Sequence, residues 1–166
     1  MLTIVQAETP EQVSTARELI EEYAAWLEFK LCFQGYEEEI QSLPGKYAPP
    51  AGRLLLAQWD GRPAGVIALR PLDEPGVCEM KRLYVRPEFR GHQIGRILAE
   101  RIIAEAAEIG YSCMRLDTIS GKMDSAIAMY RVLGFAETRP YYKTPVGETL
   151  FMELALKSNS GVGAGG

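Results

Sequence analysis

The chain alternates between two hydrophobic periods. From Pro10 to Leu27, apolar residues recur every three or four positions, which predicts an amphipathic helix. Thr9 and Gln12 frame its start, because a threonine before the first turn and a glutamine three residues later form a capping box. The same period returns from Gln93 to Ile109 and predicts a second long helix, which Gly110 ends.

Shorter runs rich in branched and aromatic residues predict strands. These runs lie at residues 2–7, 53–59, 63–72, 77–85, 113–118, 135–138 and 150–156. Short helices are predicted at 37–43 and from Asp124 or Ser125 to about Leu133. The resulting order is β-α-α-β-β-β-α-β-α-β-β, an α/β fold in which a mixed sheet carries helices on both faces. The strands at 77–85 and 113–118 flank a helix, so we expect them to be parallel and adjacent or nearly so.

Composition narrows the class of protein. The 166 residues are 47% hydrophobic and 24% charged, which is typical of one globular domain, expected at 1–157, with a flexible Gly/Ser-rich tail at 158–166. A net charge of −4 argues against a general nucleic-acid binder. The three cysteines have no paired spacing, so we expect neither a disulfide framework nor a metal site. Without a signal peptide or a bilayer-length apolar run, the sequence predicts a cytoplasmic protein that does not bind membranes.

One junction stands out as candidate chemistry. A predicted strand ends at Val85, a short loop with Arg90, Gly91 and Gly95 follows, and a helix starts at once. The free amides and the positive end of the helix dipole at such a junction bind phosphate groups. The lysine of a Walker loop and the three glycines of a dinucleotide fingerprint are both missing here.

The loop and its neighbours resemble the GNAT superfamily of N-acetyltransferases. Arg90-x-x-Gln93-x-Gly95 is similar to that family's acyl-CoA loop, Q/R-x-x-G-x-G/A, and Leu83-Tyr84-Val85-Arg86-Pro87 looks like its fourth strand. Ala126-Ile127-Ala128-Met129-Tyr130-Arg131-Val132-Leu133-Gly134-Phe135 resembles its A-x-x-x-Y-x-x-x-G-F segment. The resemblance covers Leu2 to Leu156. It implies the acyl-CoA N-acyltransferase fold and the direct transfer of an acetyl group from acetyl-CoA to a primary amine.

The resemblance also implies where acetyl-CoA binds. Its pyrophosphate would lie on the loop, mostly on the backbone amides of Arg90, Gly91, His92, Gln93, Ile94, Gly95 and Arg96. Its pantetheine arm would run along the strand that contains Leu83, Tyr84 and Val85, with Tyr84 pointing to the opposite face from the other two. The alternative to a pyrophosphate site is an ordinary strand-to-helix turn whose arginines are solvated.

Two positions depart from the family pattern. Gln93 replaces a glycine of the loop, which is tolerable if its backbone is already helical. Met123 stands where the family often has an asparagine, so a polar contact is absent or is supplied by Ser120, Lys122 or Ser125.

Two residues are candidates for proton transfer. Tyr130 matches the family's tyrosine beside the sulfur of CoA, where a phenol would protonate the leaving thiolate. Glu79 resembles the glutamate that some members use as a general base, although a salt bridge to Lys81 or Arg82 explains it equally well. The single histidine, His92, lies at the diphosphate end and is not a catalytic candidate.

The acceptor site is the least defined part of the prediction. Aromatic residues gather in two segments that the resemblance places beside the acceptor groove: Phe29, Phe33, Tyr36, Tyr141 and Tyr142. They suit a groove with apolar walls, or packing under a long loop. The acceptor partner would be a small-molecule amine or a protein amino group, and the resemblance is compatible with a homodimer. The alternatives are a non-catalytic acyl-CoA-binding or regulatory module and, more remotely, a nucleotide-binding protein.

Overall fold

The computed structural model describes residues 1–27 and 35–157, and within them the strands form one seven-stranded sheet. Its spatial order is β1-β2-β3-β4-β5-β7-β6, and every neighbouring pair is antiparallel except β4 and β5. The strands are β1 (Leu2–Gln6), β2 (Arg53–Trp59), β3 (Arg62–Pro71), β4 (Val77–Val85), β5 (Cys113–Ile119), β6 (Ala136–Glu137) and β7 (Thr149–Ala155). The predicted element order and the parallel, adjacent pair are confirmed.

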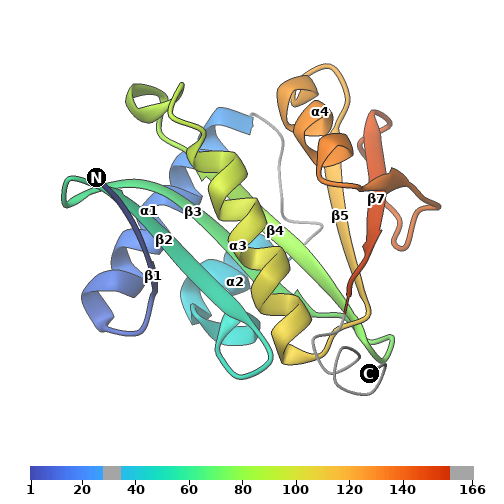
Figure 1. Ribbon diagram of the computed structural model, residues 1–166, viewed down its shortest axis with the longest axis horizontal. Coiled ribbons are helices and arrows are strands. Elements are labelled where there is room, and N and C mark those ends of the chain that lie inside the picture. Colours follow the sequence, from blue (N-terminus) through green and yellow to red (C-terminus); the bar gives the residue numbers. More distant parts are fainter. Residues whose placement is uncertain (28–34, 158–166) are drawn as a thin grey trace.

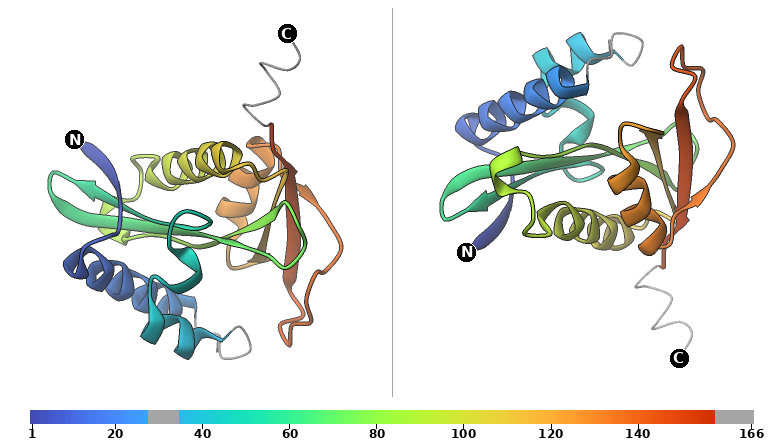
Figure 2. Two further views of the ribbon diagram at one scale, coloured as in Figure 1. Left: turned by 90° about the horizontal axis from the view of Figure 1, so that it is seen from below. Right: turned by 90° about the horizontal axis from the view of Figure 1, so that it is seen from above.

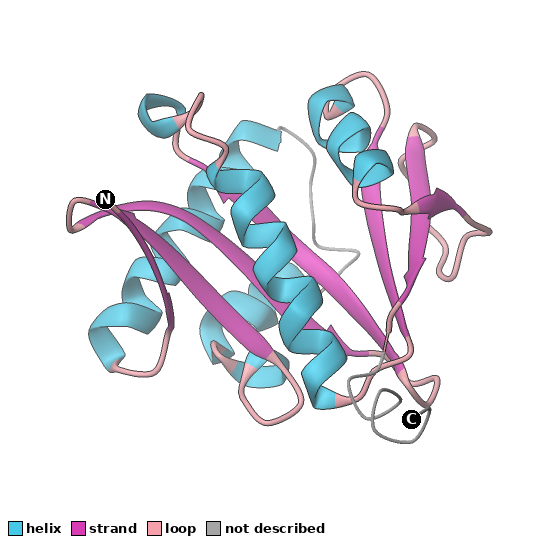
Figure 3. Ribbon diagram, viewed as in Figure 1, coloured by secondary structure: helices cyan, strands magenta, loops and turns pink. Residues whose placement is uncertain are grey.

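Helices cover both faces of the sheet, as predicted. α1 (Pro10–Leu27) and α2 (Tyr36–Ser42) lie on one face, and α3 (Ile94–Ile109) and α4 (Asp124–Val132) lie on the other (Figures 1 and 2). Two short 3-10 helices, η2 (Gly45–Tyr47) and η3 (Pro87–Phe89), lie in the connections. Figure 3 shows the same arrangement coloured by type of element.

The ends of the long helices follow from their capping residues. The Gln12 backbone N–H donates to Thr9 Oγ1 at 3.1 Å, and the Thr9 N–H donates to Gln12 Oε1 at 3.1 Å, which is the predicted capping box. Gly110, with a φ of 112°, ends α3 in the left-handed conformation that glycine adopts without steric cost.

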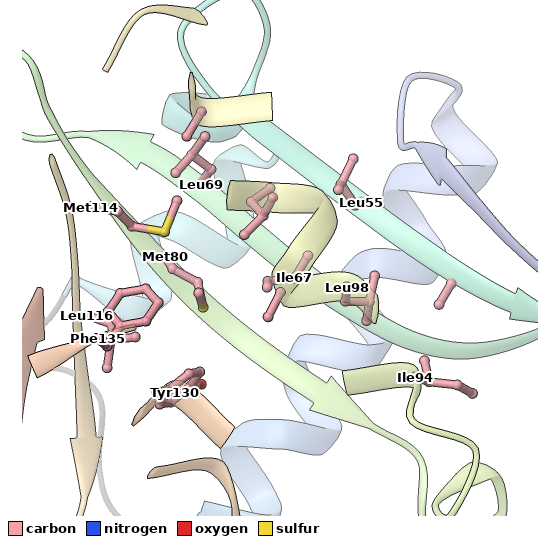
Figure 4. Close-up of a cluster of buried hydrophobic side chains, with 14 of the residues drawn as sticks. Leu55, Ile67, Leu69, Met80, Ile94, Leu98, Met114, Leu116, Tyr130 and Phe135 are labelled. Carbon is pink, nitrogen blue, oxygen red and sulfur yellow. The ribbon is translucent and has the colours of Figure 1, made fainter. Parts of the chain in front are cut away.

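Each face of the sheet has its own hydrophobic core. On the α3 side, Leu55, Ile67, Met80, Leu98 and Met114 pack together (Figure 4). On the α1 side, the cluster is formed by Leu19, Ile20, Leu54, Leu56 and Val66. Neighbouring residues of β2 therefore enter opposite cores, and this strand is buried on both faces.

The side-chain alternation of β4 changes phase at Arg82. Before it, Met80 faces the α3 core; after it, Leu83 and Val85 do so, while Tyr84 belongs to the α1 core. Arg82 has a φ of 62°, and the register with β3 slips between Val66 and Ala68, which marks a β-bulge.

Strands β4 and β5 pair only at their beginnings. Val77–Glu79 of β4 lie opposite Cys113–Arg115 of β5, and within the described residues the ladder goes no further. Figure 1 shows the two strands starting together and then separating toward the start of α3. β5 stays paired with β7 along its whole length. The second half of β4 thus turns a free backbone edge into the gap.

Candidate functional site

A cavity of ≈ 420 Å³ occupies the gap between β4 and β5. Its walls come from the second halves of both strands, the end of α1 and the starts of α3 and α4. The backbone polar groups of an unpaired strand edge can bind an extended ligand as if it were another strand. The sheet therefore provides a cleft with a backbone wall on the β4 side.

The predicted phosphate loop forms one end of this cavity. Arg90, Gly91, Gln93, Ile94 and Gly95 all line it. The Arg90 Nε–H donates to the carbonyl of Val85 at 3.1 Å, so the start of the loop is tied to the end of β4. The amides of the first turn of α3 have no acceptor inside the helix, which makes this end suitable for an anionic group.

The condition under which a side chain at Gln93 would be tolerable, a helical backbone, is not met. Its backbone is left-handed, with a φ of 60° and a ψ of 22°, instead of already helical. The loop must reverse direction between η3 and α3, and the left-handed residue at the N-cap makes this turn. A glycine adopts that conformation without strain, whereas a residue with a Cβ costs about 1–2 kcal/mol. The turn explains why this position suits the glycine of the family pattern.

Two members of the predicted loop set are not among the residues that line the cavity. His92 stacks on Trp59, with ring centroids 4.5 Å apart. Arg96 points along the exposed face of α3, with its Nε 3.6 Å from Glu100 Oε2. Their contribution to cofactor binding stays a prediction, and the stacking of His92 gives it a structural role in the loop.

The β4 residues predicted to contact the pantetheine arm, Leu83, Tyr84 and Val85, line the cavity. The opposite orientation of Tyr84 is confirmed: its ring lies in the α1 core, and its hydroxyl donates to Glu22 Oε1 at 3.4 Å. Arg86, which follows them, is held by the same Glu22 carboxylate at 2.6 Å. The basic residues of this stretch thus point in different directions and do not form one surface patch.

Tyr130 on α4 reaches the cavity from the β5 side. It is 7% exposed, and its ring packs edge-on against Phe135, with centroids 5.7 Å apart (Figure 4). Burial raises the pKa of the Tyr130 phenol, and the nearby Tyr23 and Asp117 raise it further. The hydroxyl therefore remains protonated and able to donate at any physiological pH.

The start of α4 also lines the cavity, at Lys122, Met123 and Ser125. Of the three residues considered as replacements for the missing asparagine, Lys122 and Ser125 lie in the lining and Ser120 does not. Thr118 Oγ1 lies 3.2 Å from Met123 Sδ, so this methionine packs against β5.

Glu79 is buried beside the cavity and is not among its lining residues. One carboxylate oxygen accepts from Arg70 Nε at 2.7 Å, and the other accepts from the Tyr141 hydroxyl at 2.5 Å. Lys81 Nζ lies 3.8 Å from the second oxygen. Both oxygens are engaged. Of the two salt-bridge partners expected for Glu79, Lys81 is within 4 Å, whereas Arg82 is paired with Glu39 and the shorter ion pair is with Arg70. The general-base role of Glu79 stays a prediction.

The predicted acceptor aromatics do not all reach the cavity. Tyr142 lines it, and its hydroxyl donates to Asp117 Oδ2. Tyr141 lies outside with Glu79, and Tyr36 packs under the guanidinium of Arg82, 5.9 Å from its ring centroid. Phe29 and Phe33 lie outside the described residues.

Several lining residues were missed by the sequence reasoning: Tyr23, Trp26, Lys81, Arg82 and Asp117. The sequence indicates Lys81 and Arg82 only as possible salt-bridge partners of Glu79. A signal was available, because charged residues inside a strand buried on both faces require partners or a cavity.

The end of the cavity away from the phosphate loop, where Lys81 and Asp117 lie, is called the inner end. Buried charges surround it. The Arg82 guanidinium donates to both oxygens of Glu39 at 2.9 Å, which joins the bulge of β4 to α2. Burial raises the pKa of Glu39, but the hydrogen bonds and charge of Arg82 outweigh it and hold the pKa below its ordinary value. Burial lowers the pKa of Lys81, while the charges of Asp117 and Glu79 act in the opposite direction.

Comparison with known proteins identifies the family. A profile described as the acetyltransferase (GNAT) family matches residues 16–135. The chain belongs to the GNAT family.

Relatives of this GNAT protein match along most of its length. An uncharacterized N-acetyltransferase of Schizosaccharomyces pombe is 36% identical over 156 residues, which cover 93% of this chain and 95% of that protein. An IAA acetyltransferase of Azospirillum brasilense is 41% identical over 112 residues, or 66% of this chain and 71% of that protein. The crystal structure of a GNAT acetyltransferase from Staphylococcus aureus Mu50 superposes with a TM-score of 0.77 at 22% identity, covering 95% of this chain and 100% of that one. The expected superfamily and fold are confirmed.

Within 1–27 and 35–157, no histidine, cysteine and carboxylate side chains gather in a group of three or more that would hold a metal ion. No helix in this part of the chain has the length and apolar character needed to cross a membrane.

Proposed function

We propose that this GNAT protein transfers the acetyl group of acetyl-CoA to a primary amine of a small molecule by direct attack. The observation that carries the proposal is the single cavity that runs from the start of α3, along the free edge of β4, to Tyr130. That cavity offers an anion site, a hydrogen-bonding edge and a proton donor in the order in which a pyrophosphate, an amide-containing arm and a thioester follow one another.

The residues present fit acetyl-CoA in detail. Gly91, with a φ of 94°, and Gly95 allow the backbone of the loop to approach a diphosphate closely. An added Cβ at Gly91 would have nothing within 4 Å, and one at Gly95 would meet Val85 Cγ2 at 3.8 Å. Arg90 and Lys122 line the same cavity and supply positive charge.

Proton transfer is assigned to two groups that line the cavity, Asp117 and Tyr130. The attacking amine must lose a proton, and Asp117 is the carboxylate among the lining residues. An acceptor that arrives as an ammonium first releases one proton to solvent. As the new C–N bond forms and the C–S bond breaks, a second proton passes from the nitrogen to Asp117, and the leaving thiolate takes a proton from Tyr130. Transfer of the Asp117 proton to Tyr130 through solvent restores both groups. In this proposal Glu79 positions Tyr141 and Lys81 and is not itself the base.

Two measurements on the purified chain test the proposal. Calorimetry measures the affinity for acetyl-CoA, with ATP as the competing ligand, and a thiol reagent measures the CoA that amines release from acetyl-CoA. We expect saturable binding of acetyl-CoA and amine-dependent thiol release. Absence of both would overturn the proposal, and tight binding without release for any amine would favour the non-catalytic module.

A further inference from the structure

Two opposite charges face the inner end of the cavity from the two separating strands. Lys81 on β4 and Asp117 on β5 each lie two residues beyond the last paired positions, Glu79 and Arg115. Both side chains line the cavity, and the charge of Asp117 favours the protonated form of Lys81. A cation and an anion are thus presented across the opening from rigid strands.

The neighbouring buried charges form ion pairs, and Glu79 serves two of them, because Lys81 Nζ lies 3.8 Å from its Oε2. Arg70 is paired with Glu79 at 2.7 Å, and Arg82 is paired with Glu39 at 2.9 Å. These pairs surround the inner end without changing its net charge. The charge pattern that a ligand meets there is therefore set by Lys81 on one side and Asp117 on the other.

The burial of Lys81 has a cost that a ligand can reduce. Its side chain is 2% exposed, and an ammonium removed from water is stabilised when a further anion comes within contact distance. A carboxylate on the acceptor would provide that anion. The acceptor amine, which is an ammonium before reaction, would meet Asp117 in the same way.

We propose that the acceptor is a free amino acid or a similar small molecule that carries a carboxylate beside its primary amine. Lys81 on β4 binds the carboxylate and Asp117 on β5 binds the amine, so that each charged group of the acceptor meets a side chain of opposite charge. This inference rests on the proposed acetyl transfer and names the acceptor class for it. The walls at this end include Tyr23, Trp26 and Leu27 of α1, which suit an apolar side chain on the acceptor.

Matched acceptors test this directly on the wild-type chain. L-leucine and L-phenylalanine are compared with their decarboxylated amines and with their amides, at equal concentrations of the unprotonated amine. We expect kcat/KM for each amino acid to exceed that of its two analogues by at least about tenfold, because the analogues offer Lys81 no carboxylate. Equal or better turnover of the decarboxylated amines, or turnover only of peptide N-termini, would overturn the inference.

A variant pair adds a second test. The measured quantity is kcat/KM for the amino acid divided by kcat/KM for its decarboxylated amine. In Lys81→Met, we expect this ratio to fall toward one, mainly through a higher KM for the amino acid. Lys46→Met makes the same chemical change at an exposed position of η2 and should keep the wild-type ratio. A ratio in folded Lys81→Met that equals the wild-type ratio would contradict the role of Lys81. If this variant does not fold, the matched acceptors on the wild-type chain still decide.

The outcomes separate the two proposals. If acetyl-CoA neither binds nor releases thiol with any amine, the transfer activity fails, and this inference fails with it. If thiol is released with amines that lack a carboxylate as readily as with amino acids, transfer stands and only the acceptor class is wrong.

Discussion

The two ends of the cavity are built in different ways. The end at α3 is made from one continuous segment, Arg90 to Gly95, and it acts through backbone amides and a helix terminus. The inner end is made from side chains of three separate elements, with Lys81 on β4, Asp117 on β5 and Tyr23 on α1. Glu39 of α2 lies behind it and is paired with Arg82.

The contrast shows what each kind of site demands of a sequence. A backbone site tolerates most side chains and constrains the few positions where the chain must turn or come close to a ligand. A charge cluster tolerates almost any backbone and constrains the side chains, because each buried charge needs its partner. We expect substitutions at the two ends to separate binding, turnover and stability accordingly.

The largest effect is expected from removing the proposed base at the inner end. Asp117→Asn should lower kcat/KM for the amine by about 10³-fold, because the variant neither binds the ammonium nor accepts its proton. Glu79→Gln makes the same change beside the cavity and should reduce stability more than turnover, since Arg70 and Tyr141 both bind Glu79. Steady-state kinetics and denaturant unfolding measure the two. A folded Glu79→Gln variant with the greater kinetic loss would return the base role to Glu79.

Tyr130→Phe should lower kcat by about 10²-fold with little change in acetyl-CoA affinity, because only the proton donor is lost. Since burial raises the pKa of Tyr130 above its ordinary value of 10.0, the wild-type profile should show no falling limb from this group below pH 10. Thiol release across pH and calorimetry make the comparison. Unchanged turnover in Tyr130→Phe would remove it from the mechanism.

Glu39→Gln tests the charges of the inner end through stability. Breaking the buried pair with Arg82 should cost about 3 kcal/mol of unfolding free energy at pH 7. Because the folded-state pKa of Glu39 is lowered, its contribution is present above the ordinary value of 4.5 and disappears as the pH falls through the folded value. Urea unfolding at several pH values should show the unfolding free energies of the wild-type chain and Glu39→Gln converging in acid. A difference that stays constant with pH would show that the carboxylate charge is not responsible.

The backbone end should respond to size and not to charge. Gly95→Val places a branched side chain where the loop approaches the diphosphate and should raise the Kd of acetyl-CoA by about tenfold or more. Gly95→Ala is the matched control, since its Cβ finds ordinary contact and alanine favours a helix by up to about 1 kcal/mol. Its effect on binding should be clearly smaller. Equal losses in the two variants would indicate that no ligand comes close at this position.

The smallest effect is expected at Gln93. Replacing a left-handed glutamine with glycine relieves about 1 kcal/mol of backbone strain, part of which is offset by the greater freedom of glycine in the unfolded chain. Gln93→Gly should therefore raise the unfolding free energy by less than about 1 kcal/mol. Thermal and urea unfolding measure the difference, and a loss of stability would mean that the glutamine side chain makes a stabilising contact.

The helices and strands could be predicted from the sequence more completely than the residues of the candidate site. Capping boxes, terminal glycines and hydrophobic period act within a few residues, so the bounds of β2 and β4 were predicted correctly. The loop of the backbone end was found for the same reason. The inner end required knowing that the β4 bulge places Lys81 and Arg82 on one face and that β5 diverges beside them, and neither feature has a local signature. Tyr141 and Tyr142 are neighbours in sequence, yet one binds Glu79 and the other Asp117, which only the folded loop determines.

The bulge at Arg82 has a consequence for how this strand can vary. Side chains in a strand alternate between the two faces of the sheet, and the extra residue at the bulge shifts this alternation by one. Even-numbered residues of β4 face the α3 core before the bulge, and odd-numbered residues face it afterwards. Deleting Arg82 would restore a single frame with Leu83, Tyr84 and Val85 on the faces they have now. Deleting Leu83 while the bulge is kept would instead move Tyr84 and Val85 to opposite faces of the sheet. Insertions and deletions in related chains should therefore avoid this strand or arrive in compensating pairs.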